Sequence, residues 1–378
     1  MNNIEMKDII KKPGKRGKSI LLFSKVKFSL TLLILSGILF TMGKIIPGFS
    51  DWYYKYVYFV LQNTICRLFS LFPFSIYEFL IIGFTLYICY RAIKCIYLLF
   101  KKKIKFKDAF KMSIVNISLY ISIFIFLNII SQSVNSFKSS FVTLANIEIQ
   151  EVNEESLIKV CEVLRDRLNI LDEKILKDKD GLMVLEDNTG KKGIENMKKL
   201  SEKYPCLNGF YPNPKPYVFS EIMSYQLLQG ETTFTIEANY NNDMAESNIP
   251  STICHELSHI QGFNNENEAN YISFLSCINS DSYEYQYSGY LMAYIYCISD
   301  LYEFNKEAFN EVNSGLCENV KNEIRSDSMY WSSYRGTISK LYTKVYDILL
   351  KVGGQKEGIK SYNGVVKLVV SSYQNEWQ

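Results

Sequence analysis

The sequence is poor in histidine and has no closely paired cysteines. Only two histidines occur among 378 residues, and none of the nine cysteines forms a Cys-x-x-Cys pair. Thiolate zinc ligands are not expected, because the two histidines define a different class of metal site. The six cysteines after residue 150 are irregularly spaced, which suits buried free thiols at least as well as disulfides.

A large excess of either charge is also missing, since the formal net charge is +3. Basic residues are instead concentrated at 11–18 and 101–111, beside apolar stretches. No base-stacking or groove-reading motif accompanies them, so we expect no nucleic-acid partner. Basic blocks next to hydrophobic segments are typical of the cytoplasmic side of a membrane.

Three apolar stretches are long enough to cross a bilayer, at about 28–46, 74–100 and 113–134. The first stretch could alternatively be a cleavable signal peptide. It is long, begins late and lacks a small-residue cleavage site before Pro47, so a membrane span is the better interpretation. We therefore expect a membrane domain over 28–134 with three transmembrane helices and the lipid bilayer as a partner.

The segment 51–73 is interrupted by Lys55, Gln62, Asn63 and Arg67. Both basic blocks can face the cytoplasm only if an even number of crossings separates them. The segment is therefore expected to be an interfacial or re-entrant helix, with 1–27 a cytoplasmic tail. Three crossings then place 135–378 outside the cytoplasm as the catalytic domain of a multi-pass protein of the bacterial cell membrane.

The part after the membrane domain is predicted to be mainly α with a small β component. Apolar residues recur with helical period over 151–176, and a second helix is expected over 193–204. Three alternate prolines make 211–216 extended. The β-branched and aromatic residues at 232–236 predict a strand that continues to 240, and helices are expected again from 250.

Both histidines belong to one pentapeptide, His255-Glu256-Leu257-Ser258-His259. Positions i and i+4 of a helix lie on the same face, so both imidazoles can bind one metal ion, and Zn²⁺ suits them. Glu256 is displaced from that face. It is expected to act as the general base toward the water that zinc activates.

We predict a metal helix over 251–261 that ends at Gly262, followed by a helix that begins near Glu266. A carboxylate in the first turn of that second helix could be the third metal ligand. Glu268 is the predicted ligand and Glu266 the alternative. The competing interpretation of either residue is a solvated carboxylate favoured by the helix dipole.

Two weaker candidates complete the predicted site. In zinc peptidases an edge strand commonly binds extended peptide through its backbone, which would make Ala238 and Asn239 substrate-binding residues. An ordinary exposed strand explains them equally well. Tyr287 is a candidate donor to the developing oxyanion. Because the chain has 28 tyrosines, packing in a helical core is the more frequent role for one of them.

The sequence resembles an uncharacterised bacterial family of multi-pass membrane proteins known only as a domain of unknown function. The resemblance covers most of the chain. It rests on PNPKP (212–216), EAN (237–239), CHELSHIQGF (254–263), ENEANYISFLSC (266–277), YSGYL (287–291) and GIKSYNGVVKL (358–368). The E-x-E-A-N piece (266–270) is also similar to gluzincin-type zinc peptidases, which implies a zincin-like domain with Glu268 as third ligand. Many gluzincins place that ligand farther downstream.

These observations predict a membrane-anchored zinc metallopeptidase that hydrolyses polypeptide outside the cytoplasm. One alternative is a membrane sensor or signalling receptor with a zinc-binding ectodomain. Another is a zinc hydrolase of a non-peptide envelope substrate. A structural zinc site is disfavoured because such sites usually have four protein ligands. The residues do not indicate an oligomeric state.

Overall fold

The computed structural model describes residues 15–352 and 364–377. The first part of the expected cytoplasmic tail, 1–14, and residues 358–363 of the GIKSYNGVVKL motif lie outside the described residues. The chain divides into two compact units. The first consists of Met1–Met42 and Leu80–Ile130, and the second of Gly43–Phe79 and Ser131–Gln378.

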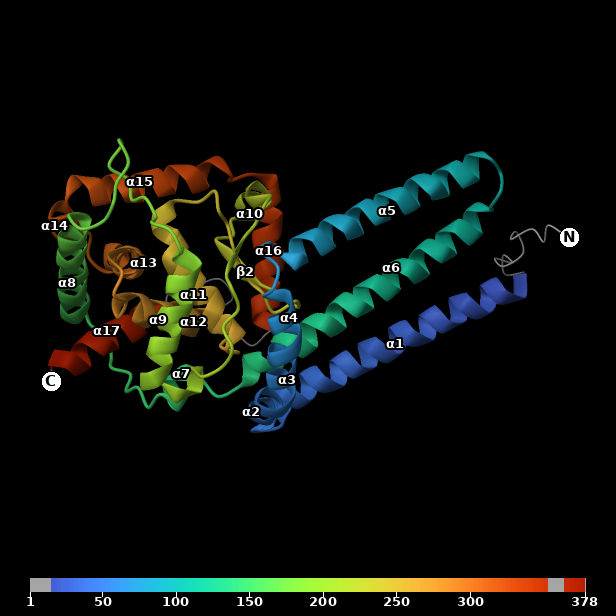
Figure 1. The fold of residues 1–378 in the computed structure, drawn as a ribbon, viewed down its shortest axis with the longest axis horizontal. Coiled ribbons are helices and arrows are strands. Elements are labelled where there is room, and N and C mark those ends of the chain that lie inside the picture. Colours follow the sequence, from blue (N-terminus) through green and yellow to red (C-terminus); the bar gives the residue numbers. More distant parts are fainter. Residues whose placement is uncertain (1–14, 353–363, 378) are drawn as a thin grey trace, which may run out of the picture. The chain divides into compact units, whose positions relative to one another are not determined.

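The prediction of three long apolar helices near the N-terminus is confirmed (Figure 1). They are α1 (Lys15–Ile45), α5 (Ile76–Phe100) and α6 (Phe106–Asn128). With η3 (Ile129–Ser133) and η4 (Asn135–Phe137), the third apolar helix extends beyond the predicted stretch. Their surfaces carry large exposed apolar side chains, which suits helices surrounded by lipid.

The segment between α1 and α5 belongs to the second unit. It is a nearly continuous helix made of α2 (Phe49–Tyr53), η1 (Tyr54–Tyr58), α3 (Phe59–Leu61), η2 (Gln62–Cys66) and α4 (Arg67–Phe69). One face, with Tyr58 and Cys66, is fully buried, while Trp52 and Phe59 are exposed. Tyr58 and Gln62 both donate hydrogen bonds to the carbonyl oxygen of Ile260. An interfacial position in the membrane stays a prediction.

The core of the second unit is built around α11 (Ile249–Ile260), which packs against α9 (Thr189–Lys203), α12 (Glu266–Ile278) and α13 (Tyr283–Phe304). The predicted helix over 151–176 is α8 (Glu154–Asp172). It begins with a capping box between Asn153 and Ser156. The remaining helices are α7 (Phe141–Leu144), η5 (Pro205–Leu207), α10 (Ser220–Gln226), η6 (Glu246–Asn248), α14 (Lys306–Ser314), α15 (Glu318–Ser333), α16 (Thr337–Val352) and α17 (Gly364–Trp377).

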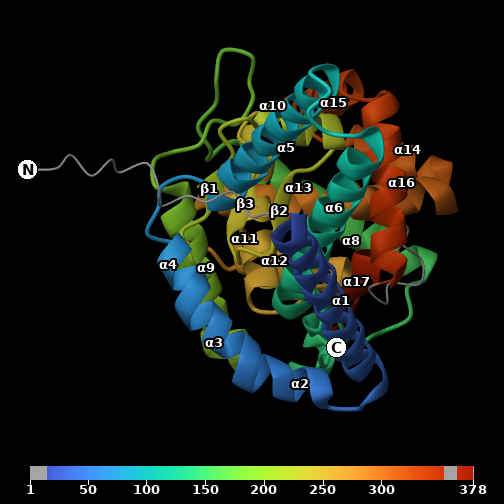
Figure 2. The same cartoon turned by 90° about the vertical axis from the view of Figure 1, so that its right-hand side faces the viewer.

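A small sheet lies against α11, as Figures 1 and 2 show. Its strands are β1 (Lys215–Pro216), β2 (Gly230–Thr232) and β3 (Ala238–Tyr240), in the order β1-β3-β2. The prediction of one continuous strand over 232–240 is wrong. Backbone turning at Thr233–Ile236, with Ile236 at φ 56°, makes an antiparallel β2–β3 hairpin from residues whose β-branching favoured a single strand.

The hairpin also corrects the predicted edge strand. Ala238 and Asn239 lie in β3, which pairs with β1 on one side and with β2 on the other. Both residues are buried, and the amide nitrogen of the Asn239 side chain donates to the backbone oxygen of Glu231. Their backbone is therefore not available to an added strand. Among the described residues, the free edge next to α11 belongs to β2.

A buried ion pair holds the sheet to the start of α5. Lys215 and Glu237 are 2% and 1% exposed, and their Nζ and Oε1 atoms lie 2.5 Å apart. The Glu237 carboxylate also accepts hydrogen bonds from the backbone nitrogens of Ile76 and Tyr77, at the first turn of α5. Glu78 makes the return contact, because its carboxylate accepts from the backbone nitrogens of Val218 and Phe219.

Candidate metal centre

The ends of α11 follow from its sequence. Pro250 occupies the first turn, where its missing N–H costs no helical hydrogen bond. After Ile260 the chain leaves the helix through Gly262 at φ 74°. The backbone nitrogens of Gly262 and Phe263 donate to the oxygens of His259 and Ser258, which is a Schellman motif. The helix therefore stops just beyond the second histidine, as predicted.

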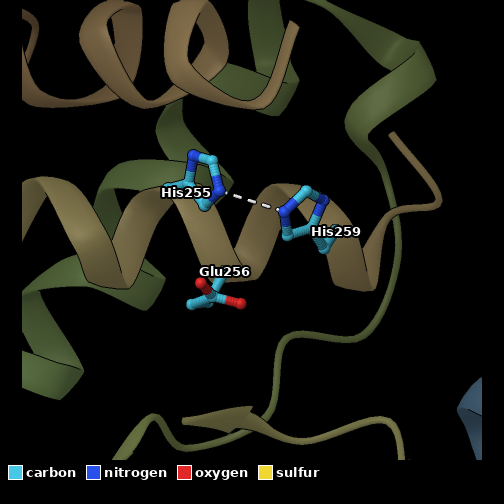
Figure 3. Close-up of side chains that lie close together, drawn as sticks. All are labelled: His255, Glu256 and His259. Carbon is cyan, nitrogen blue, oxygen red and sulfur yellow. Dashed lines mark hydrogen bonds between the residues drawn. The ribbon is translucent and has the colours of Figure 1, made fainter. Parts of the chain in front are cut away.

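The two histidines meet as their spacing predicts. Their Nε2 atoms lie 3.0 Å apart, and the ring planes are nearly perpendicular, at 87°. Figure 3 shows the rings facing each other on one side of α11, with Glu256 on another side of the helix. One candidate ligand atom of each of His255, Glu256 and His259 lies within 4.8 Å of the other two.

A hydrogen bond orients the second ring. The Nδ1 atom of His259 lies 2.9 Å from the carbonyl oxygen of Phe263, so it must carry the proton to donate. The Nε2 lone pair is then directed away from the backbone and toward His255. Hydrogen bonds of this kind fix the tautomer and orientation of metal-binding imidazoles.

The carboxylate nearest the histidines is that of Glu266. Its Oε2 atom lies 3.2 Å from the Nε2 of His255 and 3.8 Å from the Nε2 of His259. Glu268, the predicted third ligand, is not brought to the rings, because its Oε1 accepts a hydrogen bond from the backbone nitrogen of Phe141 at 2.8 Å. Asn265 caps α12, so that Glu266 is its first residue. Residues two apart on a helix point about 200° apart, and only Glu266 therefore turns back to α11.

These three groups fit a zinc ion by distance and by chemistry. Two nitrogens bound tetrahedrally to zinc at about 2.0–2.1 Å lie about 3.3 Å apart. The observed separations of 3.0, 3.2 and 3.8 Å bracket that value. Two imidazoles and one carboxylate form a donor set typical of catalytic zinc sites, which leave one coordination position open.

The three groups shift one another's pKa values. Burial alone would raise the pKa of Glu266, but the hydrogen bond from His255 and the two rings hold it at about 2. Burial would lower the pKa of His255, and Glu266 raises it instead. Burial and the neighbouring His255 lower the pKa of His259 to about 4. A neutral His259 beside an ionised Glu266 is the protonation state that metal binding needs.

Glu256 lies between the histidines and the edge strand β2. It is 3% exposed, and its Oε2 accepts a hydrogen bond from the hydroxyl of Thr232 at 2.8 Å. Burial raises the pKa of Glu256 to about 8, against the opposing effects of His255 and Thr232. A Cβ atom at Gly230 would collide with the side chain of Glu256, so glycine lets β2 approach this closely.

Tyr287 is not part of this cluster. It is 1% exposed in α13, where burial, followed by the charges of Glu323 and Asp172, raises its pKa. The sequence did not indicate a role for Tyr346 of α16. Its hydroxyl donates a hydrogen bond to Oε1 of Glu266 at 2.9 Å. Tyr346 is 80 residues from Glu266 in the chain, and no local pattern marks it.

A family model described as "Protein of unknown function (DUF3810)" matches residues 53–370, which is most of the chain. No curated protein and no solved structure matches the chain in the other two comparisons. The matched range includes α11, α12 and α16, and thus every residue of the candidate metal centre described above. The chain belongs to the DUF3810 family.

Proposed function

We propose that this protein is a membrane-anchored zinc metallopeptidase, with His255, His259 and Glu266 as metal ligands and Glu256 as general base. The observation that carries the proposal is the triangle of two imidazole nitrogens and one carboxylate oxygen at 3.0–3.8 Å beside a buried carboxyl group. Glu266 replaces Glu268 as the proposed third ligand because of its distance from the rings.

Zinc held by these residues would supply a Lewis acid for the scissile carbonyl and a lower pKa for water in the site. The protein's own contribution is proton transfer. The Glu256 carboxylate accepts a proton from the attacking water and passes it to the leaving amine. Burial raises the pKa of Glu256, which brings it closer to neutral pH and favours a group that first accepts and then releases a proton.

A polypeptide substrate is supported by β2. Its free edge can add an extended peptide through backbone hydrogen bonds, and Thr232 at its end already contacts Glu256. A peptide paired with Gly230–Thr232 would therefore pass the general base. This arrangement of a metal helix under an edge strand supports a zincin-like domain.

The membrane location is supported by the way the units are composed. Three crossings by α1, α5 and α6 put 46–75 and the chain after α6 on the same side of the bilayer. The second unit combines these same two parts in one compact body. If the basic block at 101–111 between α5 and α6 faces the cytoplasm, as such blocks commonly do, the proposed metal centre would lie outside it.

The decisive experiment combines metal analysis with hydrolysis. The purified full chain is expected to carry about one zinc per molecule and to cleave a broad peptide library in a chelator-sensitive manner. The Glu256→Gln variant is expected to keep the zinc and to lose hydrolysis by about 10²-fold or more. Equal turnover by that variant would remove Glu256 as the base, and a chain without zinc would refute the proposal.

A signalling receptor is the second candidate, favoured by one observation. The carboxylate of Glu237 ties the sheet beside the metal centre to the first turn of α5, an apolar helix of membrane length. A change at the sheet would thus reach that helix directly. Full signalling by Glu256→Gln in cells that depend on the protein would favour a receptor over a peptidase.

A further inference from the structure

The helix α16 carries an apolar stripe that no described part of the protein covers. The side chains of Ile338, Leu341, Val345, Ile348 and Leu349 are 48–65% exposed, and that of Val352 is 53% exposed. At about 100° per residue they occupy one arc of about 100° on the helix surface. An apolar stripe of this length would promote aggregation if it were exposed to water.

Lysines line one side of the stripe. Lys340, Lys344 and Lys351 share a neighbouring arc, and all three are exposed. Asp347 is the single acidic residue of the helix, and Lys351 contacts it. A stripe of large aliphatic residues flanked by lysines is typical of helices that lie in the surface of an anionic bilayer.

The flank of the stripe opposite the lysines faces the candidate metal centre. Tyr346 donates its hydroxyl hydrogen to Glu266 at 2.9 Å, and the ring of Tyr342 stacks on that of Tyr346. Burial and then the charge of Glu231, a β2 residue, raise the pKa of Tyr342. Tyr346 therefore ties α16 to a candidate ligand, and Tyr342 packs against Tyr346.

The neighbours of α16 lie next to an apolar helix of membrane length. The helix packs mainly against α10 (Figure 1), whose exposed residues include Ile222 and Tyr225. Just before α10, the backbone of Val218 and Phe219 is bound by Glu78 in the first turn of α5. Val218 and Phe219 are 59% and 49% exposed, so α10 and the residues before it also carry exposed apolar side chains.

We propose that α16 docks on the bilayer surface through its apolar stripe and thereby forms a lipid-bound cover over the metal centre. The proposal rests on the membrane attachment proposed above, but not on hydrolysis. The candidate ligands are nearly closed off, since the side chains of His255 and His259 are 14% and 12% exposed. With α16 docked in this way, a substrate would reach the candidate ligands beside α16, at the level of the lipid headgroups. The substrates favoured by this geometry are polypeptide segments that lie close to the membrane surface.

Photo-crosslinking of the full chain in vesicles tests the docking. The photoreactive residue p-benzoylphenylalanine is placed singly at Leu341 or Ile348 of α16, in vesicles of phosphatidylethanolamine and phosphatidylglycerol with a radioactive phospholipid tracer. Leu86, within α5, is the positive control, and Phe304, at the end of α13, is the negative control. All four side chains are similarly exposed, at 60–65%, so exposure alone cannot separate them.

Lipid adducts are expected at Leu341, Ile348 and Leu86, and not at Phe304. Adducts at Leu86 alone would overturn the docking of α16 while leaving the membrane attachment intact. Adducts between two copies of the chain at the α16 positions would also overturn it, because the stripe would then be a protein interface. No adduct at any position would refute the membrane attachment and, with it, the inference. A Leu341→Lys/Ile348→Lys variant with the probe at Val345 should lose its lipid adduct while eluting like the parent on size exclusion.

Discussion

At the scale of single residues, the proposed metal centre depends on which of two glutamates turns toward the histidines. Asn265 accepts hydrogen bonds from the backbone nitrogens of Asn267 and Glu268, which fixes where α12 begins. The E-x-E-A-N motif includes both Glu266 and Glu268, but it does not indicate which of their side chains points toward α11. The histidine pair could be predicted because its spacing is local. The choice of glutamate could not, because it depends on the loop that precedes α12.

The two glutamates provide a matched pair of variants. Glu266→Ala is expected to weaken zinc binding by about 10²-fold or more, since it removes one of three proposed ligands. Glu268→Ala should keep zinc binding within a few fold, because its carboxylate contacts Phe141 and not the rings. Titration with a zinc-buffering chelator measures both. The reverse order of effects would restore Glu268 as the ligand.

Lys138 should make the stability of the second unit depend on pH. Its Nζ donates to the carbonyl oxygen of Gln261 and lies 3.6 Å from the ring centroid of Phe263, and burial lowers its pKa to about 7. Between about pH 7 and the ordinary lysine value of 10.5, the unfolded chain binds a proton that the folded chain does not. Stability contributed by this residue therefore rises with pH over that window.

Replacing Lys138 by Met removes this titration. Between pH 7.5 and 9.5 the wild type should gain stability relative to Lys138→Met, by at most about 1.4 kcal/mol per pH unit. Thermal unfolding of both chains in the same detergent across this range measures the difference. Parallel curves for the two chains would show that Lys138 titrates normally.

At the scale of elements, the end of α11 depends on one glycine. Gly262 has φ 74°, and a Cβ there would lie 2.8 Å from a ring carbon of Tyr54. Gly262→Ala should therefore cost about 1–3 kcal/mol through backbone strain and this contact. Gly336→Ala is the control, because a Cβ at Gly336 meets no atom within 4 Å. Thermal unfolding is the measurement, and equal midpoints would contradict the expectation.

The buried ion pair between Lys215 of β1 and Glu237, the residue before β3, should contribute far more to the free energy of unfolding than a surface ion pair. Lys215→Met leaves Glu237 buried without its counter-ion and is expected to cost about 3–5 kcal/mol. Lys199→Met removes the exposed pair with Asp281 and should cost less than about 1 kcal/mol. Denaturant unfolding in detergent compares them, and similar midpoints would show that Glu237 finds another partner.

Elements with strong local signals could be predicted, and those set by distant packing could not. The capped, periodic α8 and the apolar α5 follow from their own residues. The hairpin at Thr233–Ile236 does not, because β-branched residues favour extended structure and the turn depends on pairing with α11 and β1. Tyr287 and Tyr346 look alike in sequence, and only tertiary packing places the second one at Glu266.

At the scale of the whole molecule, the orientation in the membrane can be tested by labelling. Single cysteines at Asn188 and Lys103, both exposed, are introduced after the native cysteines have been replaced. A membrane-impermeant maleimide added to intact cells should label position 188 but not 103. Both should react after permeabilisation, which controls for reactivity. Labelling of position 103 alone in intact cells would place the metal centre in the cytoplasm.

The membership of 43–79 in the second unit has a consequence for how the protein is made. Gln62 receives its buried partner, the carbonyl of Ile260, only after 198 further residues have been synthesised. The first two apolar helices therefore leave the ribosome with the connecting helix between them still lacking its packing surface. The face that is buried in the folded protein, including Tyr58 and Cys66, therefore has to be shielded by lipid or by a chaperone until α11 has been synthesised. Truncated chains that end before α11 should accordingly be recognised as misfolded and degraded, even though their three long apolar helices are complete.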